Sequence, residues 1–126
     1  MGAQRKAGGQ EPAELGSQEA INEVRLVGRL SAVPEEKELP SGDTLVSFRV
    51  VVPRPPDPKR TTKVDALECV AWTSRAKRSV RSWRMGDVVE VDGELRRRFF
   101  RTGSGPASRV EVQVTKGRVV RRARTG

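Results

Sequence analysis

Apolar residues recur at every second position in five short stretches of the chain, the pattern of strands with one packed and one solvated face. In the first stretch Gly28 falls on the packed face, where a residue without a side chain predicts a bulge or tight bend. The predicted strands are Glu23–Ala32, Val46–Val52, Val64–Thr73, Gly86–Phe100 and Val110–Val114.

One stretch changes to the helical period. Residues 74–85 repeat their apolar side chains, Trp83 among them, at intervals of three or four, and basic residues cover the rest of the surface. Thr73 or Ser74 can cap the start of this helix, and Gly86 stands where a helix end needs left-handed φ. Trp83 is therefore expected in the core rather than against a ligand.

The elements follow one another as strand, strand, strand, helix, strand, strand. This order predicts an all-β domain with one helix, a five-stranded Greek-key barrel of the OB-fold type with its helix between strands three and four. Pro40–Asp43 has turn chemistry, because proline fixes φ and glycine supplies positive φ. The link Arg54–Lys63 is long, basic and proline-rich. It serves either as an arm that holds a ligand or as a plain connector.

The fourth predicted strand carries the residues most suggestive of a ligand. Alternation of side chains along this strand puts Leu95 on the packed face and Glu90 on the solvated face. The same alternation places Arg96, Arg98 and Phe100 in one solvated row. Cations that neutralise phosphates beside a ring that stacks on a base are what a strand needs to hold an unpaired nucleic-acid strand.

A structural explanation of the same segment competes with this one. The arginines could protect an edge strand against aggregation while Phe99 lies in the core. Alternation in the third strand likewise puts Trp72 on the other face from Leu67 and Ala71. Trp72 therefore either stacks on a base or packs at the barrel rim.

The net charge of +9 strengthens the nucleic-acid interpretation, because it is placed unevenly. Residues 96–126 carry ten basic side chains against Glu111 alone, whereas the remainder of the chain is nearly balanced. A field of one sign favours a polyanionic partner, although a merely solvated tail would have the same composition.

Composition argues against an enzyme. The chain of 126 residues has no histidine and a single cysteine, Cys69, which parity turns inward. No Ser/His/Asp, Cys/His or zinc constellation can be assembled, and no cofactor or metal is expected. One cysteine and no secretory or membrane-spanning segment predict a cytoplasmic, nucleoid-associated protein. We expect a disordered leader at 1–21, the folded domain at 22–120 and a basic flexible tail at 121–126.

The chain resembles the bacterial single-stranded DNA-binding proteins. The matching segments are Asn22–Leu30, Pro34-Glu35, Pro40–Gly42, Val46–Val50, Val70–Thr73 and Gly86–Leu95, and the likeness extends over about residues 22 to 120. It implies an OB-fold that is not an enzyme, assembles as a homotetramer or dimer and wraps single-stranded DNA.

The same resemblance implies roles for individual residues. Trp72 and Phe100 fall on positions that stack bases in this family. Arg96 and Arg98 fall on basic positions of the strand that carries Phe100. The full set of phosphate contacts that we expect is Arg54, Lys59, Arg60, Lys63, Arg96, Arg98 and Arg101.

This chain also departs from the family pattern. Ala66 stands where many members have a stacking tryptophan, Pro55 and Pro56 occupy a region that commonly holds another, and Glu68 replaces a residue that is often basic. The sequence ends on basic residues instead of an acidic tip that recruits other enzymes. We therefore expect a short accessory paralogue with weaker, more salt-dependent binding.

The predicted function is sequence-independent binding and protection of single-stranded DNA in replication, repair or recombination. The main alternative is an OB-fold module for protein interaction, such as a primosome accessory component, without strong nucleic-acid binding. An RNA-binding OB-fold is a further alternative, which a preference for ribo-oligomers would indicate.

Overall fold

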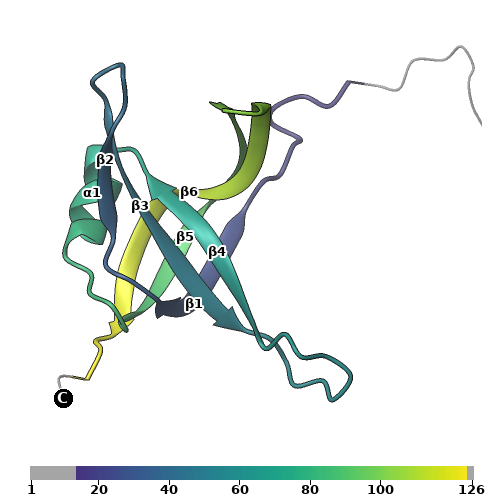
Figure 1. The fold of residues 1–126 in the computed structure, drawn as a ribbon, viewed down its shortest axis with the longest axis vertical. Helices are drawn as coiled ribbons and strands as arrows, with labels where there is room; N and C mark the ends of the chain where they lie inside the picture. The colour runs from purple at the N-terminus through teal and green to yellow at the C-terminus, as the bar shows by residue number, and fades with distance from the viewer. Residues whose placement is uncertain (1–13, 125–126) are drawn as a thin grey trace, which may run out of the picture.

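The computed structural model describes residues 14–124, which form six strands and one helix (Figure 1). In chain order these are β1 (Val24–Leu30), β2 (Glu35–Glu38), β3 (Thr44–Pro53), β4 (Val64–Ala71), α1 (Ser74–Arg81), β5 (Val88–Thr102) and β6 (Gly105–Arg121). Residues 1–13 of the predicted leader and residues 125–126 of the predicted tail lie outside the described residues.

The strands close into a barrel. Their order in the sheet is β1-β5-β6-β4-β3-β2, and β1 also pairs with β3 at Arg29↔Val51 and Leu30↔Val50. All pairings are antiparallel except β4 with β6. The five long strands form the predicted Greek-key barrel, and α1 connects the third of them to the fourth, so the predicted fold class is confirmed.

The short strand β2 is the element that the hydrophobic pattern does not predict. All four of its residues are exposed, so it has no buried face to produce alternation, and it pairs with β3 alone. The turn predicted at residues 40–43 joins these two strands. Gly42 there has φ of 94°, which glycine adopts without strain.

Side chains from five strands and α1 fill the barrel, together with Trp83 from the turn after α1. Trp83 is 3 % exposed and meets Phe48 edge to face, with ring centroids 5.4 Å apart. A Cβ at Gly117 would lie 2.6 Å from the Trp83 ring, so the ring needs a glycine beneath it. The expectation that Trp83 belongs to the core is confirmed.

Gly28 does not lie at a bulge. The β1–β5 register runs unbroken through Gly28↔Val89. A Cβ at this position would come within 2.4 Å of the Val51 carbonyl oxygen. Glycine is required here because the backbones of β1 and β3 approach closely where the barrel closes.

The helix starts as predicted and ends early. The Thr73 hydroxyl accepts a hydrogen bond from the Ala76 N–H at 3.1 Å, which makes Thr73 the N-cap. The helix stops at Arg81, and Gly86, with φ of 90°, lies in the turn beyond it rather than at the helix end.

Asp87 ties this turn to the end of β6. Its fully buried carboxylate accepts hydrogen bonds from the N–H groups of Arg84 and Ala123, each within 2.9 Å, and from the Arg122 guanidinium at 2.8 Å. Burial by itself would raise the pKa of Asp87, but these donors outweigh it and hold the pKa below its usual value. The first part of the predicted flexible tail is thus attached to the barrel.

Glu90 is the second buried carboxylate, and its predicted place on a solvated face is wrong. It is only 6 % exposed, because Arg25 of β1 and Arg118 of β6 cover it from the two neighbouring strands. The hydrogen bond from Arg25, together with Arg118, lowers the pKa of Glu90 despite its burial.

Candidate nucleic-acid interface

The outer half of the β5–β6 hairpin extends beyond the barrel. Pairing of β5 with β1 stops at Gly93, and from there to Thr102 the only partner of β5 among the described residues is β6. Arg96, Arg98 and Phe100 stand opposite Glu111, Arg109 and Ala107. Paired residues share a face of the sheet, so the predicted row of two arginines and a phenylalanine is present.

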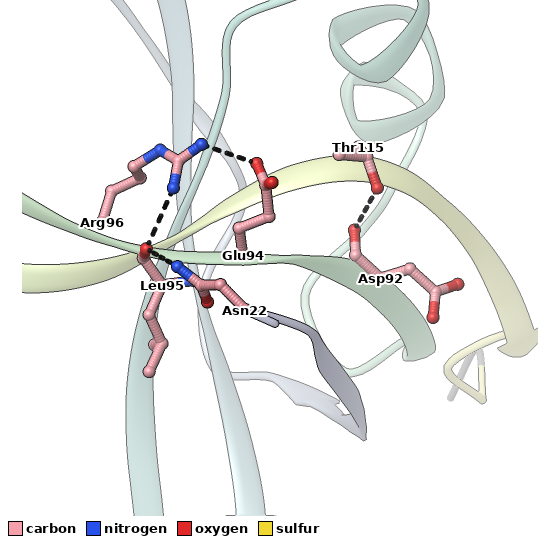
Figure 2. A network of polar contacts seen from close by, with 6 residues as sticks. All are labelled: Asn22, Asp92, Glu94, Leu95, Arg96 and Thr115. Atoms are coloured by element: carbon pink, nitrogen blue, oxygen red, sulfur yellow. Dashed lines mark hydrogen bonds and ion pairs between the residues drawn. The ribbon is translucent and has the colours of Figure 1, made fainter. Parts of the chain in front are cut away.

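Leu95 stands opposite the buried Val112 but is itself 47 % exposed, so it is not packed as predicted. In place of a neighbouring strand, β5 has the side chain of Asn22 beside it (Figure 2). The Asn22 amide donates to the Leu95 carbonyl at 2.8 Å and accepts from the Leu95 N–H at 2.9 Å. The Asn22 side chain thus takes the place of one more β1 residue in pairing with β5, at the point where the hairpin extends beyond the barrel.

The two phenylalanines of the hairpin have different surroundings. Phe99 is 76 % exposed, which rules out the alternative that it lies in the core. Phe100 is half-buried, and the guanidinium carbon of Arg109 lies 5.2 Å from its ring centroid. This contact is a cation–π interaction, which orients both groups on the face shared with Arg98.

Most of the predicted phosphate-binding arginines have a carboxylate partner. Arg96 contacts Glu94 at 3.0 Å, with both side chains exposed (Figure 2), and Arg98 contacts Glu111 at 3.7 Å. Arg54 and Arg60 contact Asp65 and Asp57. Within residues 14–124, the predicted phosphate contacts without an ion pair are Lys59, Lys63 and Arg101.

The β3–β4 loop is a braced hairpin connection. The Arg54 N–H donates to the Lys63 carbonyl at 2.8 Å, and the Arg54 guanidinium holds both oxygens of Asp65. Figure 1 shows this loop at the opposite end of the molecule from the tip of the β5–β6 hairpin. The basic residues of the loop and of the hairpin are therefore two separate groups in this structure.

Trp72 lies between the last residue of β4 and the N-cap of α1. It is half-buried, whereas its neighbour Ala71 is fully buried. No aromatic contact joins Trp72 to Phe100 in the described part of the chain. Its stacking role remains a prediction.

A groove beside this face contains three residues that the sequence did not single out as a group. It has a volume of about 610 Å³, and Arg49 of β3, Glu68 of β4 and Arg109 of β6 line it. Arg49 and Glu68 are direct cross-strand partners. Alternation along β6 is enough to place Arg109 on the same face as Glu111. That Arg109 stands opposite Arg98 follows only from the hairpin register.

The described residues contain no group of three His, Cys, Asp or Glu side chains that could hold a metal ion. Cys69 is fully buried, and its burial, with the charges of Glu68 and Glu111, raises the pKa of its thiol to about 12. A thiol in this state is a poor nucleophile. No helix within residues 14–124 has the length and apolar character needed to cross a membrane.

Sequence comparison gives matches to known proteins. The single-strand binding protein family matches residues 21–121. A single-stranded DNA-binding protein of Oceanobacillus iheyensis is 31% identical over 86 residues, which are 68% of this chain and 53% of that protein. Single-stranded DNA-binding protein A of Bacillus subtilis is 30% identical over 86 residues, 68% of this chain and 50% of its own length. The chain thus spans about half the length of these curated relatives.

Structure comparison agrees on the fold. A Plasmodium falciparum SSB solved in complex with ssDNA superposes with a TM-score of 0.66 at 23% identity, covering 81% of this chain and 95% of that one. The family match includes every strand of the barrel, the helix and the whole β5–β6 hairpin. The chain therefore belongs to the single-strand binding protein family.

Proposed function

We propose that this domain binds single-stranded DNA in replication, repair or recombination, and that its role is binding rather than catalysis. The observation that carries the proposal is the outer face of the β5–β6 hairpin. Arg98, Phe100 and Arg109 stand together there, with Arg96 one row nearer the barrel. A ring on the same face as several guanidinium groups offers a base something to stack on and the adjacent phosphates their counter-charges.

The roles divide between stacking and charge neutralisation. Phe100 and Trp72 stack bases, and Arg96, Arg98 and Arg101 neutralise phosphates along the hairpin. Arg54, Lys59, Arg60 and Lys63 form a second group of phosphate contacts on the β3–β4 loop. Every base has a π-face, so this mode of binding depends little on sequence and discriminates against duplex, whose bases are stacked on one another.

The Arg96–Glu94 ion pair of the hairpin is compatible with this role. Arg96 and Glu94 both have exposed side chains, and an exposed pair contributes only about 0–1 kcal/mol. A phosphate can therefore replace Glu94 as the partner of Arg96 at small cost. Arg96 is thus held in place in the free protein and remains available to DNA.

Binding should depend strongly on salt. Ala66 and the proline-rich β3–β4 loop provide no aromatic platform, so phosphate contacts supply a large part of the affinity. Each phosphate neutralised releases condensed counterions, which makes the affinity fall as salt rises.

A homo-oligomer, tetramer or dimer, is the assembly we infer from the family and from the edge of β1. Residues 24–28 pair with β5 on one side, and none of the described strands pairs with their other side. An open strand edge is a ready surface for a second copy. A protein that holds chromosomal single strands would act in the cytoplasm, at the nucleoid.

The test is anisotropy of labelled oligo-dT at low and moderate salt, with unlabelled duplex as competitor. We expect tight, saturable binding that duplex does not reverse, together with quenching of Trp72 fluorescence. A Trp72→Phe variant separates this signal from that of the buried Trp83. Weak binding that duplex displaces equally well would reject the proposal in favour of a protein-interaction module.

A further inference from the structure

The ladder between β5 and β6 is irregular at the base of their hairpin. The register shifts between Asp92 and Gly93, which leaves Thr115 of β6 as an extra residue. A β-bulge of this kind bends its strand and increases the local twist. A Cβ at Gly93 would lie 2.2 Å from the Gln113 carbonyl oxygen, so the two backbones also approach closely here. The bulge thus sets the direction in which the hairpin leaves the barrel.

Two side chains brace the strand on either side of this bulge (Figure 2). On the β6 side, the Thr115 hydroxyl donates to the Asp92 carbonyl at 3.0 Å, directly beside the register shift. On the β1 side, the Asn22 amide makes its two hydrogen bonds with the Leu95 backbone. Together they hold β5 by both of its edges over a few residues.

The Leu95 carbonyl connects Asn22 to the hairpin face proposed to bind DNA. This carbonyl also accepts a hydrogen bond from the Arg96 guanidinium at 3.4 Å, and Arg96 contacts Glu94 at 3.0 Å. Figure 2 shows these groups as one chain of contacts from Asn22 to Glu94. Asn22 is therefore coupled to an expected phosphate contact, although it carries no charge itself.

Farther out, the hairpin has little other support. From Leu95 to Thr102, β5 pairs with β6 alone in the described part of the chain, and an isolated two-stranded hairpin is only marginally stable in water. Phe100 lies seven residues beyond Gly93, roughly 24 Å at about 3.4 Å per residue. A turn of about 10° at the bulge would move its ring by roughly 4 Å, more than the ~3.4 Å between stacked bases. A small change of direction at the base is therefore a large one at the stacking ring.

We propose that Asn22 is a positioning residue for single-strand binding, an inference that rests on the proposed function. Its two hydrogen bonds fix the direction of the hairpin, so that Phe100 and Arg98 already face the path of the DNA. Asn22 is exposed, so water replaces these hydrogen bonds in a variant and the barrel loses little stability. What the variant loses is the fraction of molecules whose hairpin is already aimed, and the affinity falls in proportion to that fraction.

The first measurement is amide hydrogen exchange of Asn22→Ala, followed by NMR in the absence of DNA. Exchange at Leu95 and along the outer hairpin should become faster, because opening of this segment no longer breaks the two hydrogen bonds. Exchange at Val89 and Val91 in the barrel should match the wild type. Gln18→Ala is the matched control, since it removes an amide side chain from the exposed segment before β1. Thermal melting verifies that each variant is folded.

The second measurement is the affinity for labelled oligo-dT. Asn22→Ala should weaken binding about threefold to fivefold and keep the salt slope of the wild type, because no charge is lost. Thr115→Val keeps the shape of the side chain but removes its hydroxyl, and it should weaken binding in the same way. Gln18→Ala should bind like the wild type.

A double-mutant cycle with Phe100→Ala distinguishes positioning from direct contact. If Asn22 acts through the hairpin, its substitution matters less once the ring that it positions is gone. The loss caused by Asn22→Ala should therefore shrink toward no loss in the Phe100→Ala background.

The outcomes separate this inference from the proposed function. Unchanged exchange in the hairpin, or unchanged affinity for oligo-dT, would overturn the positioning role. The same loss with and without Phe100 would also overturn it, because Asn22 would then contact DNA itself. Binding of the wild type to duplex as tightly as to oligo-dT would instead reject the proposed function. The exchange measurement uses no DNA and so keeps the two failures apart.

Discussion

Arginine–carboxylate contacts occur at both ends of β5, and they differ in burial and in the number of partners. At the start of the strand, Asp87 is fully buried and receives one guanidinium and two backbone N–H groups. On the outer hairpin, Arg96 and Glu94 form a single exposed contact. The same chemistry fastens the chain in one place and holds a cation for a ligand in the other.

Burial of the acid is what separates the two uses. Removing Asp87 leaves two part-buried backbone N–H groups without an acceptor, whereas removing an exposed carboxylate leaves donors that water solvates at once. Glu90 is buried like Asp87, but its partners Arg25 and Arg118 have exposed side chains, so its removal should cost less.

We therefore expect substitution of Asp87 to affect stability and substitution of Arg96 or Glu94 to affect affinity. Arg98, whose partner Glu111 is buried, should affect both.

Asp87→Ala should give the largest effect on stability. It leaves the N–H groups of Arg84 and Ala123 without their acceptor and frees Arg122 from the turn. Loss of stability on the order of 2–4 kcal/mol is expected, because each buried group left unsatisfied costs about 1–3 kcal/mol. Urea denaturation followed by circular dichroism measures it. Glu94→Ala is the matched control and should stay within about 0.5 kcal/mol of the wild type.

Lowering the pH should also reduce the stability of the fold, by less than Asp87→Ala does. Asp87 and Glu90 both have a pKa lowered by folding, so the unfolded chain binds more protons in the acid range. Their contribution is fully present above the usual carboxylate pKa of about 4 and is lost as the pH falls through the lowered values. Denaturation midpoints measured against pH should be level near neutrality and fall below about pH 4. Asp87→Asn should flatten that fall, and an unchanged profile would remove Asp87 as its cause.

The sequence predicts those parts of the molecule whose signal is local. Alternation locates the five long strands, and helical spacing identifies Trp83 as core, because each pattern repeats within a few residues. The burial and the hydrogen bonds of Asp87 could not be predicted in this way, since its partners Arg122 and Ala123 are 35 and 36 residues further along the chain. The burial of Glu90 could not be predicted either, because β1 and β6 cover a side chain that parity puts outside.

The candidate site divides in the same way. The row of Arg96, Arg98 and Phe100 follows from parity within one strand. The cation–π contact of Arg109 needs the hairpin register, which a short turn sets and no periodicity reveals. The separation of the β3–β4 loop from the hairpin depends on how the whole barrel closes.

Phe100→Ala should give the largest loss of affinity on the hairpin. A stacked base contributes about 1–3 kcal/mol, so binding of oligo-dT should weaken roughly tenfold to hundredfold. Phe99→Ala removes an equal ring from the opposite face of the same hairpin and is the control. A similar loss in both variants would mean that the hairpin as a whole, rather than the Phe100 face, contacts DNA.

Arg96→Ala and Arg98→Ala should act through charge. Each substitution is expected to weaken binding to all sequences and to reduce the slope of log affinity against log salt by about one. Isothermal titrations at several salt concentrations give that slope. Arg75→Ala removes an exposed cation from α1 and should leave the slope unchanged. If the hairpin variants also keep the wild-type slope, these arginines do not contact phosphates.

Glu94→Gln tests the smallest effect, and it runs in the opposite direction. Glu94 competes with a phosphate for Arg96 and repels the DNA backbone, so its neutralisation should tighten binding about twofold to threefold at low salt. Salt should remove the gain, because screening weakens interactions between exposed charges. Glu38→Gln removes an equal charge from β2 and controls for the change in net charge. A gain confined to Glu94→Gln would mean that the exposed pair keeps Arg96 ready for DNA. An equal gain in both variants would reduce its role to that of one charge among many.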